Sequence, residues 1–276
     1  MKKTGKKVFL ICVFLFLAAV VFLSAYFYYP LRSYIIMAAY SAYNDMESVM
    51  HEQGFSVLIP GGTFSREKDW YPFVNIYNCG DGFSSYMDKN VDVTVLYNFG
   101  AFDTPVSSSI YNPDSDGFAA FYGAYVVKTN DENDIPYGFS ADGEVNLKEI
   151  IALPEYDYRC LVLSAFGCRD VVFEGTAPKM VAAETYAGYP GWTVFQSDIK
   201  TSSPAHSYAG DRLPYIQYGI PPEPDAPDFY TIRMKGRMYV RYFPEYESTV
   251  VLYILGKSEK TIDACDQKIL GATVIK

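Results

Sequence analysis

One short polar segment has the residue types of a calcium-binding loop. Asn112, Asp114 and Asp116 alternate with other residues and are followed by Gly117. Their oxygen atoms are the hard ligands that Ca²⁺ prefers, and the glycine permits the sharp turn of such a loop. The closing glutamate of an EF-hand is missing, because Gly123 occupies that position. The segment therefore predicts either a Ca²⁺ site, the one cofactor that the sequence indicates, or a polar β-turn between strands.

Residues for other familiar catalytic or metal sites are sparse. The chain has two histidines, His51 and His206, and neither lies in a spacing typical of a zinc site or of a nucleophile motif. Carboxylates are abundant, with 32 Asp and Glu side chains, so the composition permits the pair of carboxyl groups that glycoside hydrolysis requires. Spacing along the chain selects no such pair. The sequence leaves the catalytic residues unassigned and favours a binding protein over an enzyme.

Two cysteines are close enough in sequence to form a local bridge. Cys160 and Cys168 bracket a predicted strand and turn. An extracytoplasmic location permits disulfides. A Cys160–Cys168 bridge is therefore one hypothesis, and a pair of buried thiols is the other.

Aromatic side chains make up 17% of the chain. Trp70 and Tyr71 are consecutive, so in an extended segment they point to opposite faces, and one of them is expected to be exposed. Tyrosine and tryptophan provide large contact areas in binding surfaces. This pair is the predicted binding patch for a protein or glycan partner. The alternative is that aromatic residues fill a β-rich core.

The N-terminal segment has the pattern of a membrane anchor. Four lysines within residues 1–7 precede an uncharged, almost wholly apolar run at 8–30, and Arg32 follows it. The apolar part of this run spans about 33 Å as a helix, which matches the core of a lipid bilayer. The lysines predict a cytoplasmic tail at 1–7 and an extracytoplasmic remainder. The alternative is a cleaved signal peptide, which normally has a shorter apolar core.

Residues 31–53 predict an amphipathic helix beside the membrane. Apolar residues recur at three- and four-residue steps, and most polar residues take the other side. The expected stop is Gly54. The apolar stripe predicts that this helix covers the core of the following domain. Its members are Ile35, Ala39, Ala42, Met46, Val49 and Met50.

The remainder, 54–276, changes to the period of two that is typical of strands. Pro244–Ser248 is expected to form a hairpin loop, and 259–270 a helix. The pattern predicts an α+β fold in which a large, mostly antiparallel sheet is followed by a C-terminal helix. A β-sandwich with flanking helices is the alternative. Strands are expected at 73–77, 91–99, 119–127, 160–165, 171–173, 192–198, 237–243 and 249–255.

The charge balance limits the partners. Removing the four N-terminal lysines from 23 basic residues leaves 19 against 32 acidic ones, a net charge of −13 for the predicted extracytoplasmic part. Such a surface is repelled by phosphate backbones, so nucleic acid is not expected as a partner. None of the nine asparagines lies in an N-x-S/T sequon, which favours a bacterial cell surface.

These observations predict a single-pass membrane protein that presents an extracytoplasmic binding or interaction domain. Its expected partners are the lipid bilayer, through the N-terminal helix, and a protein or glycan outside the cell. Two alternatives come from other classes. One is a surface hydrolase that uses a carboxylate pair. The other is an immunity-type protein against an extracytoplasmic toxin, for which acidic charge and anchoring are suitable.

Overall fold

The computed structural model describes residues 2–60, 73–77, 82–98, 114, 116–130, 135–163, 168, 170–203, 229 and 231–276. Five α-helices and ten strands are defined in these ranges, together with three short 3-10 or π-helical segments. The helices are α1 (Lys2–Met46), α2 (Val49–Gln53), α3 (Gly82–Met87), α4 (Leu147–Asp157) and α5 (Glu259–Lys268), with the short segments η1 (Tyr158–Leu163), η2 (Pro244–Tyr246) and η3 (Leu270–Ala272). The strands are β1 (Val57–Leu58), β2 (Phe73–Tyr77), β3 (Val91–Asn98), β4 (Phe121–Thr129), β5 (Phe173–Gly175), β6 (Lys179–Tyr186), β7 (Tyr189–Ser202), β8 (Thr231–Phe243), β9 (Ser248–Gly256) and β10 (Val274–Ile275).

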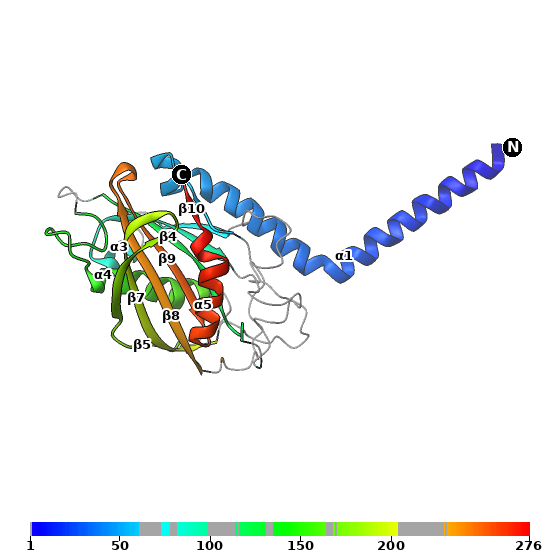
Figure 1. The fold of residues 1–276 in the computed structure, drawn as a ribbon. Coiled ribbons are helices and arrows are strands. Elements are labelled where there is room, and N and C mark those ends of the chain that lie inside the picture. The colour runs from blue at the N-terminus through cyan, green and yellow to red at the C-terminus, as the bar shows by residue number, and fades with distance from the viewer. Residues whose placement is uncertain are drawn as a thin grey trace.

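One eight-stranded antiparallel sheet dominates the domain. Its strands run in the order β2-β3-β4-β9-β8-β7, and both β5 and β6 pair with the outer side of β7. The sheet curves into a half-barrel, with α5 on one face and α4 on the opposite face (Figure 1). The predicted α+β class with a large antiparallel sheet is confirmed. The β-sandwich alternative is wrong, because the strands of the described residues form this single large sheet and the two-stranded ribbon β1-β10.

The sheet separates two apolar cores. On one face, α2 and α5 contribute side chains such as Met50 and Ile262 to the first core. On the other face, α3 and α4 contribute side chains such as Phe83 and Leu153 to the second core. The central strand β9 is almost entirely buried on both faces, as its uninterrupted apolar sequence predicts. The sheet is therefore the middle layer of three.

The hairpin predicted near the C-terminus is confirmed. Strands β8 and β9 pair from Lys235↔Gly256 to Phe243↔Ser248. A 3-10 turn that begins at Pro244 joins them, and Glu247 closes the turn with a positive φ of 47°.

The predicted C-terminal helix corresponds to α5. Ser258 caps its N-terminus, because the serine side chain accepts a hydrogen bond from the Thr261 N–H at 3.3 Å. The buried residues of α5 include Ile262 and Cys265, which the sequence places on the apolar side of this helix. The helix therefore packs on the sheet through the face that its periodicity predicts.

One predicted strand is a helix instead. The apolar sequence of 160–165 predicts an extended segment, but Tyr158–Leu163 continues α4 as a π-helix. Pro154 lies inside α4 and has no N–H to give to the helical ladder. The wider turn that follows is one way in which a helix accommodates such an interruption.

Helix α1 is continuous through the two segments that the sequence divides at residue 30. It contains Pro30, and a proline within a helix removes a ladder hydrogen bond and bends the axis. Figure 1 shows α1 bent into a protruding N-terminal arm and a second arm that reaches the domain. Among the residues with described side chains, no helix combines the length and the apolarity needed to cross a bilayer.

The end of α1 packs on the domain through its polar face, which corrects the sequence prediction. Ile35 and Met46 in the apolar stripe are 56% and 60% exposed, whereas Ser41 and Asn44 are buried. The Val74 N–H donates to Ser41 Oγ at 3.1 Å, and Asn44 Nδ2 donates to the Val74 carbonyl at 2.8 Å. The reason is that β2 is an edge strand, and these side chains satisfy backbone groups that no neighbouring strand in the described sheet reaches.

The rest of the predicted helix does cover the core. A turn follows Met46, and Ser48 caps the short helix α2 by accepting a hydrogen bond from the His51 N–H at 3.1 Å. Val49 and Met50 enter the first core from α2. Gly54 ends α2 with a φ of 70°, the left-handed conformation expected of a glycine stop.

Candidate functional site

A cavity of about 200 Å³ lies on the face of the sheet that carries α4. The last turns of α4 and the start of η1 form one side, β5 and the segment after it form the rim, and β7, β8 and β9 form the floor. Apolar and aromatic side chains dominate its lining. The helix contributes Ile151 and Pro154, and the sheet contributes Ile199, Met238 and Leu255. A concave, mainly apolar cavity of this kind is the usual form of a small-molecule site.

A glycine in the middle of β8 lies on the floor of the cavity, where neighbouring side chains pack closely over it. Gly236 pairs with Leu255 on β9 and Ser197 on β7, and all three line the cavity. A Cβ added at Gly236 would lie 2.9 Å from Ile199 Cδ1 and 3.4 Å from Leu255 Cδ2. Glycine in a strand interior weakens the strand, and it often occurs where a ligand approaches the backbone. Gly236 therefore marks the floor as a place of close approach.

Aromatic rings form much of the wall. Tyr125 on β4 and Tyr253 on β9 are stacked, with ring centroids 4.7 Å apart and planes inclined by 24°. Tyr158, at the start of η1, lies against Phe173 of β5 with centroids 5.0 Å apart. All four rings line the cavity. The two pairs come from the sheet and from the rim, so aromatic surface borders the cavity on both sides.

The two charged residues in the lining are both ion-paired. Glu155 accepts a hydrogen bond from Arg159 Nε at 3.1 Å, and a second nitrogen of that arginine donates to the Phe173 carbonyl at 2.6 Å. Arg237 sends its guanidinium to Asp263 and Asp266 on α5, on the opposite face of the sheet. The lining therefore brings no uncompensated charge from these side chains to the cavity.

Directly behind the tyrosine wall lies a buried carboxylate. Asp157, the last residue of α4, is 1% exposed and accepts hydrogen bonds from three tyrosine hydroxyls. Tyr125 donates to Oδ2 at 2.7 Å, Tyr77 donates to Oδ1 at 3.3 Å, and Tyr97 donates to Oδ1. The donors come from the adjacent strands β2, β3 and β4. The cluster thus ties the end of α4 to one half of the sheet.

Burial raises the pKa of Asp157 to about 6, although the three hydroxyls act in the opposite direction by stabilising the carboxylate. Burial likewise raises the pKa of Tyr97 and of Tyr125 well above the ordinary value. These phenols therefore stay protonated and serve as donors at neutral pH.

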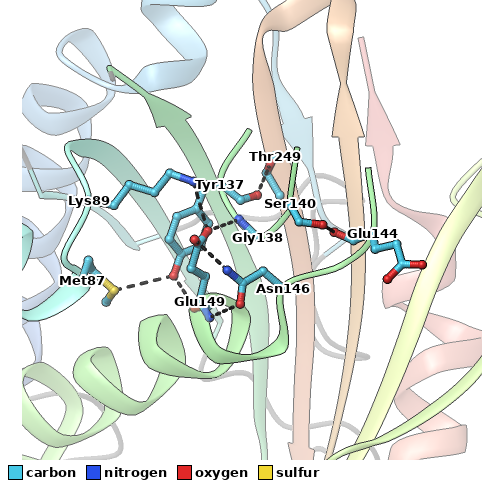
Figure 2. A network of polar contacts seen from close by, with 9 residues as sticks. All are labelled: Met87, Lys89, Tyr137, Gly138, Ser140, Glu144, Asn146, Glu149 and Thr249. Atoms are coloured by element: carbon cyan, nitrogen blue, oxygen red, sulfur yellow. Dashed lines mark hydrogen bonds and ion pairs between the residues drawn. The ribbon is translucent and has the colours of Figure 1, made fainter. Parts of the chain in front are cut away.

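A second polar network fixes the start of α4 and so positions the cavity wall (Figure 2). Asn146 caps the helix, and its Nδ2 donates to Glu149 Oε1 at 2.9 Å. The other carboxylate oxygen of Glu149 accepts from the Gly138 N–H at 2.7 Å and pairs with Lys89 Nζ at 3.2 Å. Tyr137 donates its hydroxyl to the Glu149 carbonyl. The helix that carries the cavity wall is thereby held at both ends.

No known protein family, curated protein or solved structure matches this chain. The assignment of the site therefore depends on its geometry.

The structure does not unite the site residues that the sequence predicts. Trp70, Tyr71 and Asn112 lie outside the described residues. Asp114 and Asp116 are exposed, and Asp116 accepts a hydrogen bond from Lys260 Nζ at 2.9 Å, which lowers its pKa. In the described part of the chain, no three His, Cys, Asp or Glu residues are grouped to hold a metal ion.

No disulfide joins Cys160 to Cys168. Cys160 is exposed on the π-helix η1, whereas Cys168 is buried in the second core. The two residues therefore lie in different environments, and only Cys168 has the burial that the alternative of two buried thiols requires.

The tyrosines around Asp157 are not among the predicted site residues, although the sequence carries a signal for them. Tyr97, Tyr125 and Tyr253 each lie in a strand, an even number of residues from a valine that enters the second core, so they point to the same face of the sheet. In β3, for example, Val93 and Val95 precede Tyr97 at two-residue steps. Several buried hydroxyls on one face of a sheet require hydrogen-bond acceptors there, and a buried carboxylate can serve more than one of them. A search for such an acceptor is the reasoning that could have found Asp157.

Proposed function

We propose that this protein is a membrane-anchored, extracytoplasmic binding protein whose ligand occupies the cavity between α4 and the sheet. The observation that carries this proposal is the cavity itself, a preformed space of about 200 Å³ with mainly apolar walls and a glycine on its floor. Preformed concave sites with few polar groups are typical of small-molecule binding. The partner in this proposal is a small molecule, in place of the protein or glycan that the aromatic patch predicts.

The arrangement of carboxylates favours binding over hydrolysis. A glycosidase needs two carboxyl groups that face one groove, one of them with a raised pKa. Asp157 has the raised pKa, but it lies behind Tyr125 and does not line the cavity. Glu155 does line the cavity, but it is engaged by Arg159. The described residues around the cavity therefore supply no acid–base pair that faces a ligand.

The membrane anchor in the proposal is supported by sequence. The uncharged run 8–30 follows four lysines, and α1 carries it away from the sheet (Figure 1). Every described side chain at 7–22 is exposed, so the described part of the domain covers none of this apolar surface. A bilayer would remove it from water.

The anchor and its orientation are tested together by fractionation and proteolysis. In a bacterial host, the full chain is expected to stay in the membrane pellet after an alkaline carbonate wash. Protease added outside spheroplasts is expected to remove the domain and leave a fragment that contains the lysine-rich tail. A chain recovered in the soluble fraction, or a domain that is cleaved only after lysis, contradicts this part of the proposal.

The ligand site is tested by filling the cavity from its floor. A Gly236→Val substitution adds a side chain on the cavity floor, where its Cβ would lie 2.9 Å from Ile199 Cδ1 and would push the Ile199 side chain aside. It is expected to weaken the binding of any cavity ligand at least tenfold, which corresponds to about 1.4 kcal/mol. The matched control is Thr231→Val, a nearly isosteric change at the exposed start of the same strand, which should leave binding unchanged. Equal affinities in both variants would reject the cavity as the site.

A further inference from the structure

Building on the proposed function, we propose that the ligand is an uncharged aromatic molecule of one or two rings. The inference deepens the assignment of the cavity and depends on it. Three properties of the cavity define this class: its volume, the state of the charges around it, and the rings that form its walls.

The volume limits the size of the ligand. An apolar protein cavity of about 150 Å³ accommodates benzene. By the same proportion, the cavity of about 200 Å³ accommodates roughly eight non-hydrogen atoms, which is close to the nine of indole. A fatty acyl chain of twelve or more carbons exceeds this volume, so part of its apolar surface would remain outside the cavity.

The charges around the cavity indicate that the ligand is neutral. Glu155 is paired with Arg159, and Arg237 is paired with carboxylates on α5. The carboxylate of Asp157 is surrounded by tyrosine hydroxyls and lies outside the lining. A charged ligand would lose its hydration on entry without gaining a counter-charge from these groups, which strongly disfavours its binding.

The walls favour a ring over an aliphatic group. The stacked pair of Tyr125 and Tyr253 lines one side, and Tyr158 with Phe173 lines another. Aromatic ligands can make stacked or edge-to-face contacts with such rings, which add binding energy to that from the burial of apolar surface. The hydroxyl of Tyr125 donates to Asp157, and that of Tyr253 donates to the Leu96 carbonyl at 3.3 Å. Both hydroxyls are engaged and the two stacked side chains are nearly buried, so these residues offer the ligand only a small, apolar part of their rings.

The probes for the test are indole, benzamidine, benzoate and dodecanoate. The first three each have nine non-hydrogen atoms and an aromatic ring and differ in charge, and dodecanoate is a long chain. The full-length protein is incorporated into lipid nanodiscs, and saturable binding is measured against empty nanodiscs by ligand-observed NMR. Indole is expected to bind saturably, and each charged analogue to bind at least tenfold more weakly.

Two cavity variants separate the possible failures. Gly236→Val fills the floor, and Gly175→Val enters from β5, where an added Cβ meets no atom within 4 Å. Circular dichroism checks the folding of each variant, and indole affinity should fall at least tenfold in both. If a charged analogue or dodecanoate binds as tightly as indole and is displaced by these substitutions, the ligand class is overturned while the cavity stands. If no probe responds to either substitution, both the ligand class and the proposed function are overturned.

Discussion

Replacement of Arg237 by alanine is expected to destabilise the domain by about 3 to 5 kcal/mol, because it leaves a buried carboxylate without its counter-charge. In the native structure, Arg237 Nη1 donates to Asp266 Oδ2 at 2.8 Å, and Nη2 donates to Asp263 Oδ1 at 2.9 Å. Asp266 is a buried residue of α5. The free energy of unfolding of the full chain, measured by urea titration in a mild detergent, tests this expectation.

The partners of Asp266 explain why the loss is large. Tyr186 on β6 and Tyr239 on β8 also donate their hydroxyls to this carboxylate, and their rings are stacked with centroids 3.7 Å apart. Burial raises the pKa of both phenols, so they remain donors. Two neutral donors cannot replace the cation, and the charge that remains beneath α5 would weaken the attachment of this helix to the first core.

Two further variants control this prediction. Lys235→Ala, on the same strand as Arg237, removes an exposed ion pair with Asp198 of β7 and is expected to have little effect on stability. Adding Asp266→Asn to Arg237→Ala removes the uncompensated charge and should restore part of the lost stability. The explanation fails if Arg237→Ala costs no more than Lys235→Ala, or if the second substitution makes the protein less stable still.

Strands in the middle of the sheet are predictable because their environment is simple. The alternation in 91–99 and the continuous apolar run of 249–255 correspond to β3 and β9, which differ from the predicted bounds by about one residue. Burial on one face produces the first pattern, and burial on both faces produces the second. Local sequence patterns are therefore sufficient to predict the strands in the middle of the sheet.

Strand β6 is absent from the sequence prediction because its hairpin lacks the usual turn signal. Tyr186 pairs with Tyr189, so the connection is the two-residue turn Ala187–Gly188, with φ values of 47° and 80°. A turn with two positive φ values normally begins with asparagine, aspartate or glycine. Alanine at this position gives no such indication. The strand also lies at the edge, where Met180 is exposed and the apolar pattern is weak.

The cavity could not be predicted because it depends on contacts between distant segments. Helix α4, strand β5 and the floor strands β7 to β9 come together only in the folded domain.

The exposed apolar stripe on α1 shows the same limit of prediction from local sequence. Helical periodicity identifies an apolar face, but the edge strand β2 requires hydrogen bonds, which Ser41 and Asn44 on the other face supply.

Replacement of Asp157 by asparagine is expected to change how the stability of the domain depends on pH. Because the pKa of Asp157 is about 6 in the folded state and near 3.9 in an unfolded chain, the native state binds more protons between these values. The native protein therefore loses stability as pH rises from about 4 to about 6, by at most about 3 kcal/mol from this one group. Asparagine does not titrate, so the variant lacks this loss.

The measurement is the difference between the unfolding free energies of the variant and the native protein at a series of pH values from 4 to 7.5. The carboxyls whose pKa values are lowered, such as those of Asp116 and Asp142, are present in both proteins and cancel in the difference. The difference should shift in favour of the variant as pH rises from 4 to 6 and then level off. Parallel stability curves would show that Asp157 does not titrate in this range.

The same substitution also tests the link between the buried carboxylate and the cavity. Asp157 accepts from the Tyr125 hydroxyl through Oδ2, whereas an asparagine amide that keeps its oxygen toward Tyr77 and Tyr97 presents an NH₂ donor to Tyr125. The Tyr125 hydroxyl must then accept. In the native protein, a proton on Oδ2, the oxygen that faces Tyr125, would impose the same reversal on this hydroxyl, whereas Oδ1 faces two donors. Tyr125 lines the cavity, so the native protein below pH 6 and the variant at neutral pH should show the same altered chemical shifts for this ring. Native shifts for Tyr125 in both cases would mean that the cavity wall does not respond to the charge on Asp157.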